Sequence, residues 1–188
     1  MGALPKEEQF FTYNDYAEWD LKEGERYEII YGEAYAMSAP DARHQEILMA
    51  LANQFYNFLQ GKPCRVYPAP YDVRLFYEED GNDDTVVQPD ISVVCNEKKR
   101  GEEGCRGAPD LVVEILSPSN NVFEMERKLR LYRQAGVREY WIVDPKNNGL
   151  TVYFFRKNEI MTETYEKNSI VQVAIFPELK IPLEQIFA

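Results

Sequence analysis

The segment GAPDLVVEILSPS, residues 107–119, reads as a buried β-strand with one acidic residue in its middle. The residues around Glu114 are apolar and mostly branched, which is typical of a strand that is covered on both faces. An ionised carboxylate is costly to remove from water unless it is paired, hydrogen-bonded or bound to a metal. The segment therefore predicts a specific partner for Glu114, and that partner is either structural or part of a chemical site.

A second carboxylate, Asp90, lies on the preceding predicted strand, in VVQPDISVV (86–94). Alternate residues of a strand share a face, so Asp90 points the same way as Ser92. By the same rule Glu114 shares a face with Val112. If the two strands are neighbours, the two carboxylates converge, and their mutual repulsion requires a cation. Mg²⁺ suits one or two carboxylates completed by water and phosphate oxygens, so the pair predicts a Mg²⁺ or Mn²⁺ site.

The helix predicted over 121–135 supplies a third candidate residue. At 3.6 residues per turn, Lys128 falls on the buried side of this helix. The polar side is made up of Arg127, Arg130 and Arg133. A buried lysine beside two carboxylates is placed to position a nucleophilic water or to stabilise a developing charge.

The same residues also permit structural interpretations. Glu124 and Lys128 are an i,i+4 pair in the favourable orientation, which by itself explains both residues. Glu114 and Lys128 also suit a buried ion pair without any metal. Asp110, at the start of the same strand, is either a turn residue or a further ligand. The pattern alone leaves the structural and the metal-binding interpretations open.

Two further polar residues are candidates for the site. His44 is the only histidine, which excludes a zinc site with several histidine ligands. It lies in the first turn of a helix predicted over 43–60, so it is either a capping or surface residue or a neighbour of the site. A Ser–His–Asp triad is compatible with the composition, but no nucleophile-elbow sequence is present. Glu28, in YEIIYGE (27–33), interrupts an apolar strand and is a candidate extra ligand or helper.

Composition bounds the class of protein. A chain of 188 residues suits one compact domain, residues 1–188. The net charge of −11 counts against nucleic-acid binding, although basic residues gather in 97–106 and 122–135. Three cysteines without a CxxC spacing favour a reduced, cytoplasmic protein. No stretch approaches the roughly 18 apolar residues of a membrane span, and the first ten residues lack the apolar region of a signal peptide.

Hydrophobic periodicity and turn residues predict a mixed α/β (α+β) fold, with a β-hairpin near the N-terminus and one mixed sheet flanked by helices. Capping and breaker residues place helices at 12–19, 43–60 and 121–135, the hairpin at 26–37, and strands at 64–67, 71–76, 85–95, 110–116, 138–145, 150–156 and 169–175. The strand, helix and strand within 110–144 suggest a right-handed crossover between parallel strands.

With these residues in view, the chain resembles the Uma2 family, also called DUF820, which belongs to the PD-(D/E)XK restriction-endonuclease-like superfamily. The resemblance covers nearly the whole chain. It rests on the motifs YEIIYGE, SAPDARHQEI, VVQPDISVV, GAPDLVVEILSPS, KLRLYRQAGVREYWIVDP and LKIPLEQIF. The resemblance implies a restriction-endonuclease-like αβββαβ core.

By this resemblance, Pro89-Asp90 supplies the PD of the nuclease motif and Glu114 its second acid. The position usually held by lysine is Leu116, and the resemblance implies that Lys128 on the next helix takes that role. Glu124 stands where relatives are expected to carry an aspartate.

The implied activity is hydrolysis of DNA phosphodiester bonds with Mg²⁺ or Mn²⁺. The high aromatic content, together with the two active sites that a small nuclease core commonly needs to cut a duplex, predicts a homodimer. Two other classes stay open, a catalytically silent nuclease-fold module for nucleic-acid or protein binding, and hydrolysis of RNA or another phosphodiester.

Overall fold

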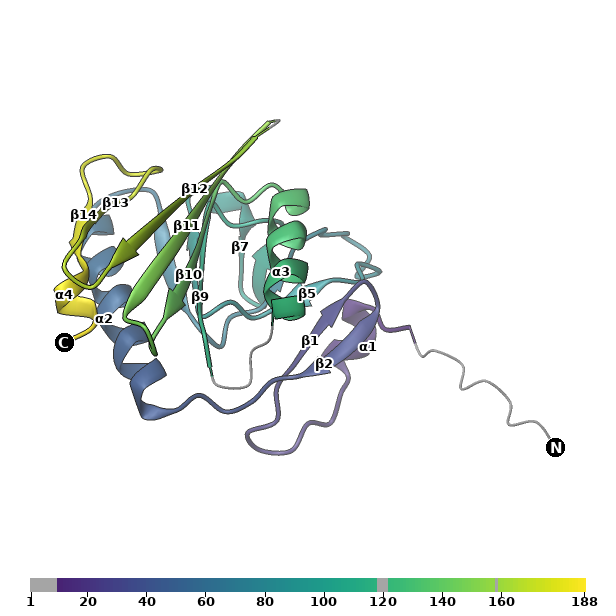
Figure 1. The fold of residues 1–188 in the computed structure, drawn as a ribbon. Coiled ribbons are helices and arrows are strands. Elements are labelled where there is room, and N and C mark those ends of the chain that lie inside the picture. Colours follow the sequence, from purple (N-terminus) through teal and green to yellow (C-terminus); the bar gives the residue numbers. More distant parts are fainter. Residues whose placement is uncertain (1–9, 118–121, 158) are drawn as a thin grey trace.

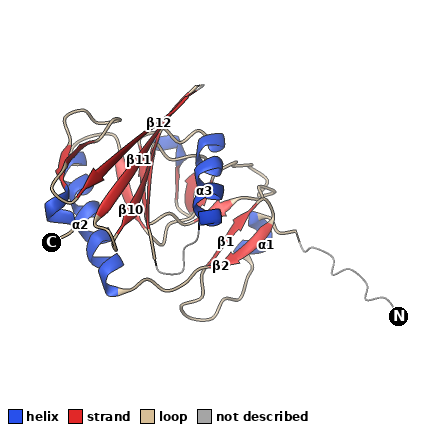
Figure 2. Ribbon diagram, viewed as in Figure 1, coloured by secondary structure: helices blue, strands red, loops and turns tan. Residues whose placement is uncertain are grey.

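The structure, a computed structural model, describes residues 10–117, 122–157 and 159–188. It is a mixed α/β fold with two mixed six-stranded sheets, a separate pair of strands and few helices (Figures 1 and 2). The start of the long helix predicted at 121, like Pro118 and Ser119 of the segment quoted first, lies outside the described residues.

The larger part of the core is built on a sheet with the strand order β12-β11-β10-β9-β6-β3. Its strands are β3 (Arg65–Pro68), β6 (Ile91–Val94), β9 (Leu111–Ile115), β10 (Glu139–Asp144), β11 (Gly149–Arg156) and β12 (Glu159–Glu166). Strands β9 and β10 are parallel, and the helix α3 (Val122–Ala135) lies between them in the chain, as the sequence predicts. All other pairs in this sheet are antiparallel.

The second sheet has the order β2-β1-β5-β4-β8-β7. Its strands are β1 (Tyr27–Ile30), β2 (Glu33–Ala36), β4 (Val73–Arg74), β5 (Val86–Val87), β7 (Arg100–Gly101) and β8 (Gly104–Arg106). The predicted hairpin is β1–β2, and its turn residues Tyr31 and Gly32 have φ of 52° and 81°. Positive φ at both turn positions matches the right-handed twist of the two strands. Tyr31 also donates from its hydroxyl to Gln134 of α3, at 2.9 Å.

Helices cover both faces of the large sheet (Figure 1). On one face pack α2 (Ala42–Leu59) and α4 (Leu183–Ile186), against the side chains of Leu111, Val113 and Ile115 among others. On the other face Val112 packs with α3 and with the second sheet. The predicted alternation along β9 is thus confirmed, and it directs Glu114 toward α3.

Local signals explain where two of the helices begin. Asp41 caps α2 by accepting from the backbone N–H of His44 at 2.8 Å, as its position before the helix predicts. The short helix α1 (Tyr13–Ala17) begins with a capping box between Thr12 and Asp15. The remaining elements are the 3₁₀ turn η1 (Glu97–Lys99) and the paired strands β13 (Ile170–Gln172) and β14 (Lys180–Pro182).

The prediction of a single mixed sheet is wrong. The strand expected over 85–95 is divided into β5, in the second sheet, and β6, in the large sheet. Pro89 lies at the division, where a residue without an N–H cannot continue a ladder. The segment 169–175 does not complete the large sheet either, because β12 occupies that edge. Most side chains of β12 are exposed, so its sequence lacks an apolar face.

The expectation that all cysteines are reduced is also wrong, since Cys64 and Cys95 form a disulfide. The antiparallel register of β3 and β6 pairs Arg65 with Val94, so the two cysteines lie opposite each other just beyond that pair. Cys105 is a buried free thiol. None of the helices in the described part of the chain is long and apolar enough to cross a membrane.

Candidate active site

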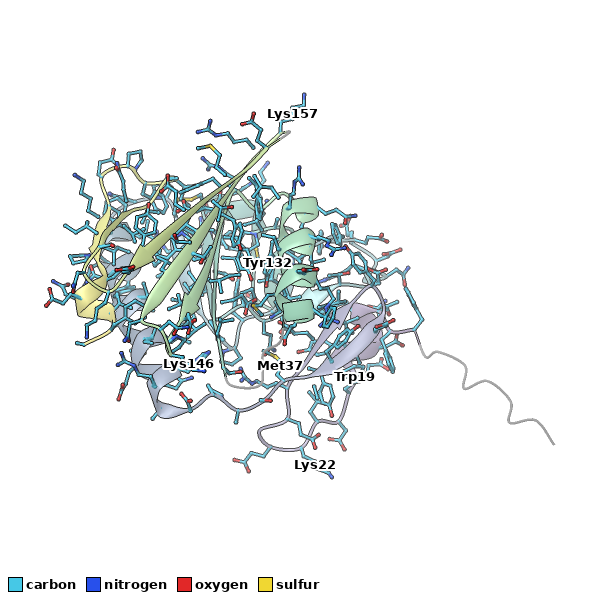
Figure 3. The ribbon with its side chains drawn as sticks, in the orientation of Figure 1. Trp19, Lys22, Met37, Tyr132, Lys146 and Lys157 are labelled. Carbon is cyan, nitrogen blue, oxygen red and sulfur yellow. A yellow bond between two sulfur atoms is a disulfide. The ribbon has the colours of Figure 1, made fainter. Side chains whose placement is uncertain are left out.

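A cleft of about 640 Å³ lies where the β1–β2 hairpin, the start of α2, the ends of β6 and β9 and the start of α3 meet. Five residues singled out in the sequence line it: Glu28, His44, Asp90, Glu114 and Lys128. Figure 3 labels Met37, which follows β2 and lines the cleft, and Tyr132 on α3, which lies between that helix and the large sheet. Each of the five lies in or next to a different element, namely β1, α2, β6, β9 and α3, so only the fold brings them together.

Strand register places the two central carboxylates side by side. Strands β6 and β9 are antiparallel with Ile91 opposite Val113, so one position further Asp90 stands opposite Glu114. Asp90 is fixed by the backbone N–H of Ile115, which donates to its Oδ2 at 2.7 Å. The convergence of these two acids is the arrangement that the sequence predicts for neighbouring strands.

Lys128 is held between two carboxylates. Its Nζ donates to Oε1 of Glu114 at 3.0 Å and to Oε1 of Glu28 at 3.2 Å. All three side chains are buried, and Lys128 is only 3% exposed. Glu28 also accepts from the backbone N–H of Gln88 at 3.0 Å. The hairpin strand β1, the strand β9 and the helix α3 are therefore joined through one ammonium group.

Burial and neighbouring charges change the acidity of this cluster. Burial raises the pKa of Glu114 to about 7; Lys128 opposes this rise, and the charges of Glu28 and Asp90 add to it. Burial alone lowers the pKa of Lys128, but the carboxylates of Glu114 and Glu28 outweigh it and raise that pKa above the ordinary value. Lys128 therefore stays protonated at neutral pH, which makes it a source of positive charge and not a general base.

His44 belongs to the site as a partner of Asp90. Its Nε2 lies 3.2 Å from Oδ2 of Asp90, and the side chain is buried. Burial lowers the pKa of His44, but the hydrogen bond and the charge of Asp90, with the charge of Asp41, outweigh burial and raise that pKa. The sequence leaves a capping or surface role and proximity to the site as alternatives. In the structure Asp41 caps the helix, and His44 is a buried residue that lines the cleft.

The donor set suits a hard divalent cation. No set of three or more His, Cys, Asp or Glu side chains is arranged as a metal cage within residues 10–117, 122–157 and 159–188. Mg²⁺ needs only one or two carboxylates, with water and phosphate oxygens completing its shell. Both side-chain donors to Glu114 act on Oε1, and both contacts of Asp90 act on Oδ2. Within the described part of the chain, one oxygen of each acid is thus left without a donor and fits such an ion.

Two residues that the sequence leaves undecided have different positions. Asp110 lies away from the cleft, where it accepts from the backbone N–H of Cys95 at 2.8 Å and from Arg138 at 3.3 Å. Its contacts are structural, in agreement with a turn residue. Glu124 does line the cleft, on the first turn of α3.

Sequence reasoning missed three functional candidates. Tyr132 is fully buried and donates to Oε1 of Glu114 at 2.5 Å. The helical period predicts Arg127 on the polar side of its helix, but the side chain lines the cleft together with Arg26. The helical period does locate Tyr132 on the apolar side of the helix. A tyrosine hydroxyl on the side that faces a buried acid is the signal that could have identified Tyr132 as a partner of Glu114. No signal in α3 alone reveals that the hairpin β1–β2 covers Arg127.

Fold and cleft together describe a mixed α/β protein with a buried carboxylate–lysine cluster, and comparison with known proteins gives the family. The model of the Uma2 family, described as "Putative restriction endonuclease", matches residues 13–184. The chain belongs to the Uma2 family, which confirms the resemblance inferred from the sequence.

Two individual proteins are similar to this chain. A protein of Synechocystis sp. PCC 6803, described as "Uncharacterized protein slr1290", is 27% identical over 146 residues, which are 77% of this chain and 73% of that protein. A crystal structure of a "putative nuclease belonging to DUF820" from Anabaena variabilis ATCC 29413 is similar with a TM-score of 0.75. It is 22% identical and covers 94% of this chain and 97% of its own, so it establishes the likeness of the fold.

Proposed function

We propose that the protein is an endonuclease that hydrolyses DNA phosphodiester bonds in this cleft with Mg²⁺ or Mn²⁺, held by Asp90 and Glu114. The observation that carries the proposal is the position of Lys128, which is bonded to Glu114 and Glu28 in the cleft that Asp90 also lines. A buried ion pair that served only stability would need neither the second acid nor an open cleft beside it. Membership of a family described as "Putative restriction endonuclease" supports the same activity.

The hydrolysis consists of attack by a water oxygen on phosphorus, breakage of the P–O bond to the leaving sugar oxygen, and transfer of a proton to that oxygen. When bound, Mg²⁺ or Mn²⁺ supplies a Lewis acid for the phosphate and lowers the pKa of water. Lys128, which stays protonated, donates a hydrogen bond that orients the water and stabilises charge on the phosphate.

The other residues of the cleft keep these groups in place. Glu28 anchors Lys128 from the hairpin side. His44 and the backbone N–H of Ile115 fix one oxygen of Asp90. Tyr132 fixes one oxygen of Glu114. Each acid is thus oriented by two donors, so that its other oxygen is presented to the cleft in a defined direction.

A metal titration combined with a cleavage assay tests the proposal. Mg²⁺ and Mn²⁺ should raise the melting temperature by binding the native state, and should support cleavage of plasmid, linear duplex or single-stranded DNA. The double variant Asp90→Asn/Glu114→Gln should lose both effects. Glu126→Gln, which changes an exposed acid of α3, is the matched control. An unchanged metal response in the double variant would show that the ion binds elsewhere.

The strongest alternative is a catalytically silent nuclease-fold module that binds nucleic acid or protein. The net charge of −11 favours it, because a protein that contacts many phosphates normally carries a basic surface. Under this alternative the metal still stabilises the protein, but no DNA form is cleaved in either metal. Cleavage of RNA in the same assay would instead select a different phosphodiester substrate.

We also propose that the protein works as a homodimer, since a small nuclease core that cuts both strands of a duplex commonly uses two copies of its active site. Aromatic residues are abundant, with 13 tyrosines and 10 phenylalanines, and such residues are enriched at protein interfaces. Light scattering at micromolar concentration should give twice the mass of the chain. A purely monomeric protein would refute the dimer without affecting the metal site.

A further inference from the structure

One wall of the cleft is positively charged in a way that the carboxylate–lysine cluster does not explain. Arg127 of α3 and Arg26, which precedes β1, both line the cleft. Within the described part of the chain, neither arginine forms an ion pair with an acidic side chain. The Nε of Arg127 is buried and has no hydrogen-bond partner among the described residues. A buried donor without an acceptor costs free energy, so its retention in a cleft points to a ligand.

Arg127 is fixed in position by an aromatic ring. Its guanidinium carbon lies 3.9 Å from the ring centroid of Tyr35 on β2. The ring is itself held, because the Tyr35 hydroxyl donates to Glu33. Arg127 also makes a side-chain hydrogen bond to Tyr35, which fixes the guanidinium further. A guanidinium held on a ring in this way can still offer other N–H groups to an oxyanion.

The position of Tyr35 shows where the two arginines lie relative to the carboxylate–lysine cluster. Strand register places Tyr35 directly opposite Glu28, one of the two partners of Lys128. Arg26 stands one position before the first pair of the same hairpin, on the face that Glu28 shares. The two arginines therefore adjoin the carboxylate–lysine cluster but are not part of it. Lys128 is committed to Glu28 and Glu114, so a second phosphate in the cleft needs a different cation.

We infer that Arg127, stacked on Tyr35 and assisted by Arg26, forms a subsite for a backbone phosphate of the nucleic acid that neighbours the bond being cleaved. The inference rests on the proposed function, and it assigns Arg127 a role in positioning the substrate. Phosphate recognition by a bidentate arginine is sequence-independent, so this subsite fixes the register of the strand in the cleft.

The helix α3 provides a matched control for this arginine. Arg130 lies three residues further along, is bonded to Glu126 at 2.9 Å, and has a side chain that is 78% exposed. Arg127→Gln and Arg130→Gln change the net charge equally and on the same helix. A difference between them therefore reports the cleft and not the overall charge of the protein.

The experiment measures binding of a fluorescein-labelled 24-base-pair DNA duplex by anisotropy in EDTA, at a series of NaCl concentrations. Each phosphate contact contributes about −0.9 to the slope of log K against log salt concentration. Arg127→Gln should reduce the magnitude of that slope by about 0.9 and weaken binding about tenfold at 0.1 M NaCl. Arg130→Gln should leave both quantities as in the wild type.

Two further variants separate charge from geometry. Arg127→Lys should restore the salt slope but not the full affinity, because lysine keeps the charge and lacks the planar fork. Tyr35→Leu should weaken binding with an unchanged slope, since it removes the stacking partner and leaves the charge. Melting curves of all variants check that each is folded, and Arg26→Gln provides a second test of the subsite if Arg127→Gln does not fold.

Each outcome has a defined consequence. Equal slopes for Arg127→Gln and the wild type, or equal losses in Arg127→Gln and Arg130→Gln, overturn the subsite and leave the proposed nuclease activity intact. A wild-type protein that neither binds the duplex nor cleaves it with Mg²⁺ or Mn²⁺ overturns the proposed function, and the subsite with it. Binding that depends on Arg127 without any cleavage supports the subsite in a silent nucleic-acid-binding module.

Discussion

Tyr132 donates a 2.5 Å hydrogen bond to the same carboxylate oxygen of Glu114 that accepts from Lys128 at 3.0 Å. Tyr132 and Lys128 are four residues apart on α3, so one turn of the helix presents both donors to one acid. Both side chains are buried, which makes the arrangement costly to break. The buried acid of β9 is thus held by two residues of α3, the next helix along the chain.

Tyr132→Phe should destabilise the protein and weaken metal binding. Loss of a buried hydrogen bond to a charged group typically costs about 1.5–3 kcal/mol. The Tyr132 hydroxyl also helps to lower the pKa of Glu114, so its removal raises that pKa further and lets protons compete better with Mg²⁺. Urea denaturation measures the first effect, and thermal titration with Mg²⁺ at pH 7 and pH 8.5 the second. Full metal affinity at pH 7 in Tyr132→Phe would contradict a positioning role.

A buried ion pair joins Asp83, in the acidic loop 77–84, to Arg74 of β4. We expect this pair to control the stability of the second sheet. Asp83 accepts from both Nε and an amino group of Arg74, and neither side chain is more than 7% exposed. Asp83→Asn leaves a buried guanidinium without its counter-charge. Such a change typically lowers the free energy of unfolding by about 3–5 kcal/mol. The exposed neighbour Asp80→Asn should change stability by less than about 0.5 kcal/mol. Similar urea midpoints for the two variants would refute the structural role of this pair.

The central part of the site was predictable from the sequence because it depends on the side-chain periods of single strands and helices. The two-residue period of strands lets Asp90 and Glu114 converge once their strands are neighbours, and the helical period places Lys128 on the buried side of the following helix. These predictions need only the assumption that consecutive elements are neighbours, which holds for most folds.

What the sequence could not supply depends on contacts between elements that are distant in the chain. Arg127 is exposed on an isolated helix and becomes part of the cleft only because the hairpin carrying Tyr35 packs beside α3. The division of the strand at Pro89 required knowledge that two sheets exist. The edge strand β12 has polar and apolar residues on exposed faces, so its burial pattern carries no strand signal.

Glu139 should make the protein less stable as the pH rises above the ordinary glutamate range. This carboxyl is fully buried and accepts from Trp141 Nε1 at 2.8 Å and from the backbone N–H of Ile175 at 3.0 Å. Burial raises its pKa, although these hydrogen bonds oppose the rise. Between the unfolded and the folded pKa, the folded state holds a proton that the unfolded state has lost, so stability falls with increasing pH.

The measurement is the free energy of unfolding of wild type and Glu139→Gln at a series of pH values from 4 upward. At low pH the variant is expected to be less stable than the wild type. The reason is that the hydrogen-bond donors of its amide differ from those of the protonated acid that it replaces. The difference between the two proteins should shrink as the pH rises through the folded pKa of Glu139. A constant difference across this range would show that the carboxyl titrates as it does in the unfolded chain.

Lys128→Met distinguishes a structural ion pair from a catalytic cluster. In EDTA the variant leaves Glu28 and Glu114 buried without their shared cation, and breaking such a pair typically costs about 3–5 kcal/mol. Saturating Mg²⁺ should restore much of this stability, because a divalent ion at Asp90 and Glu114 supplies positive charge to the same cluster. DNA cleavage should nevertheless be abolished, since the donor that orients the water and stabilises the phosphate is absent.

Adding Glu28→Gln to Lys128→Met provides the control for charge alone. It removes one of the two unpaired carboxylates, so the double variant should recover part of the lost stability in EDTA while staying inactive. Urea denaturation with and without Mg²⁺, beside a plasmid cleavage assay, measures both properties on the same samples. A Lys128→Met protein that is as unstable with Mg²⁺ as without it would show that Lys128 serves the fold, and the nuclease proposal would then lose the observation that carries it.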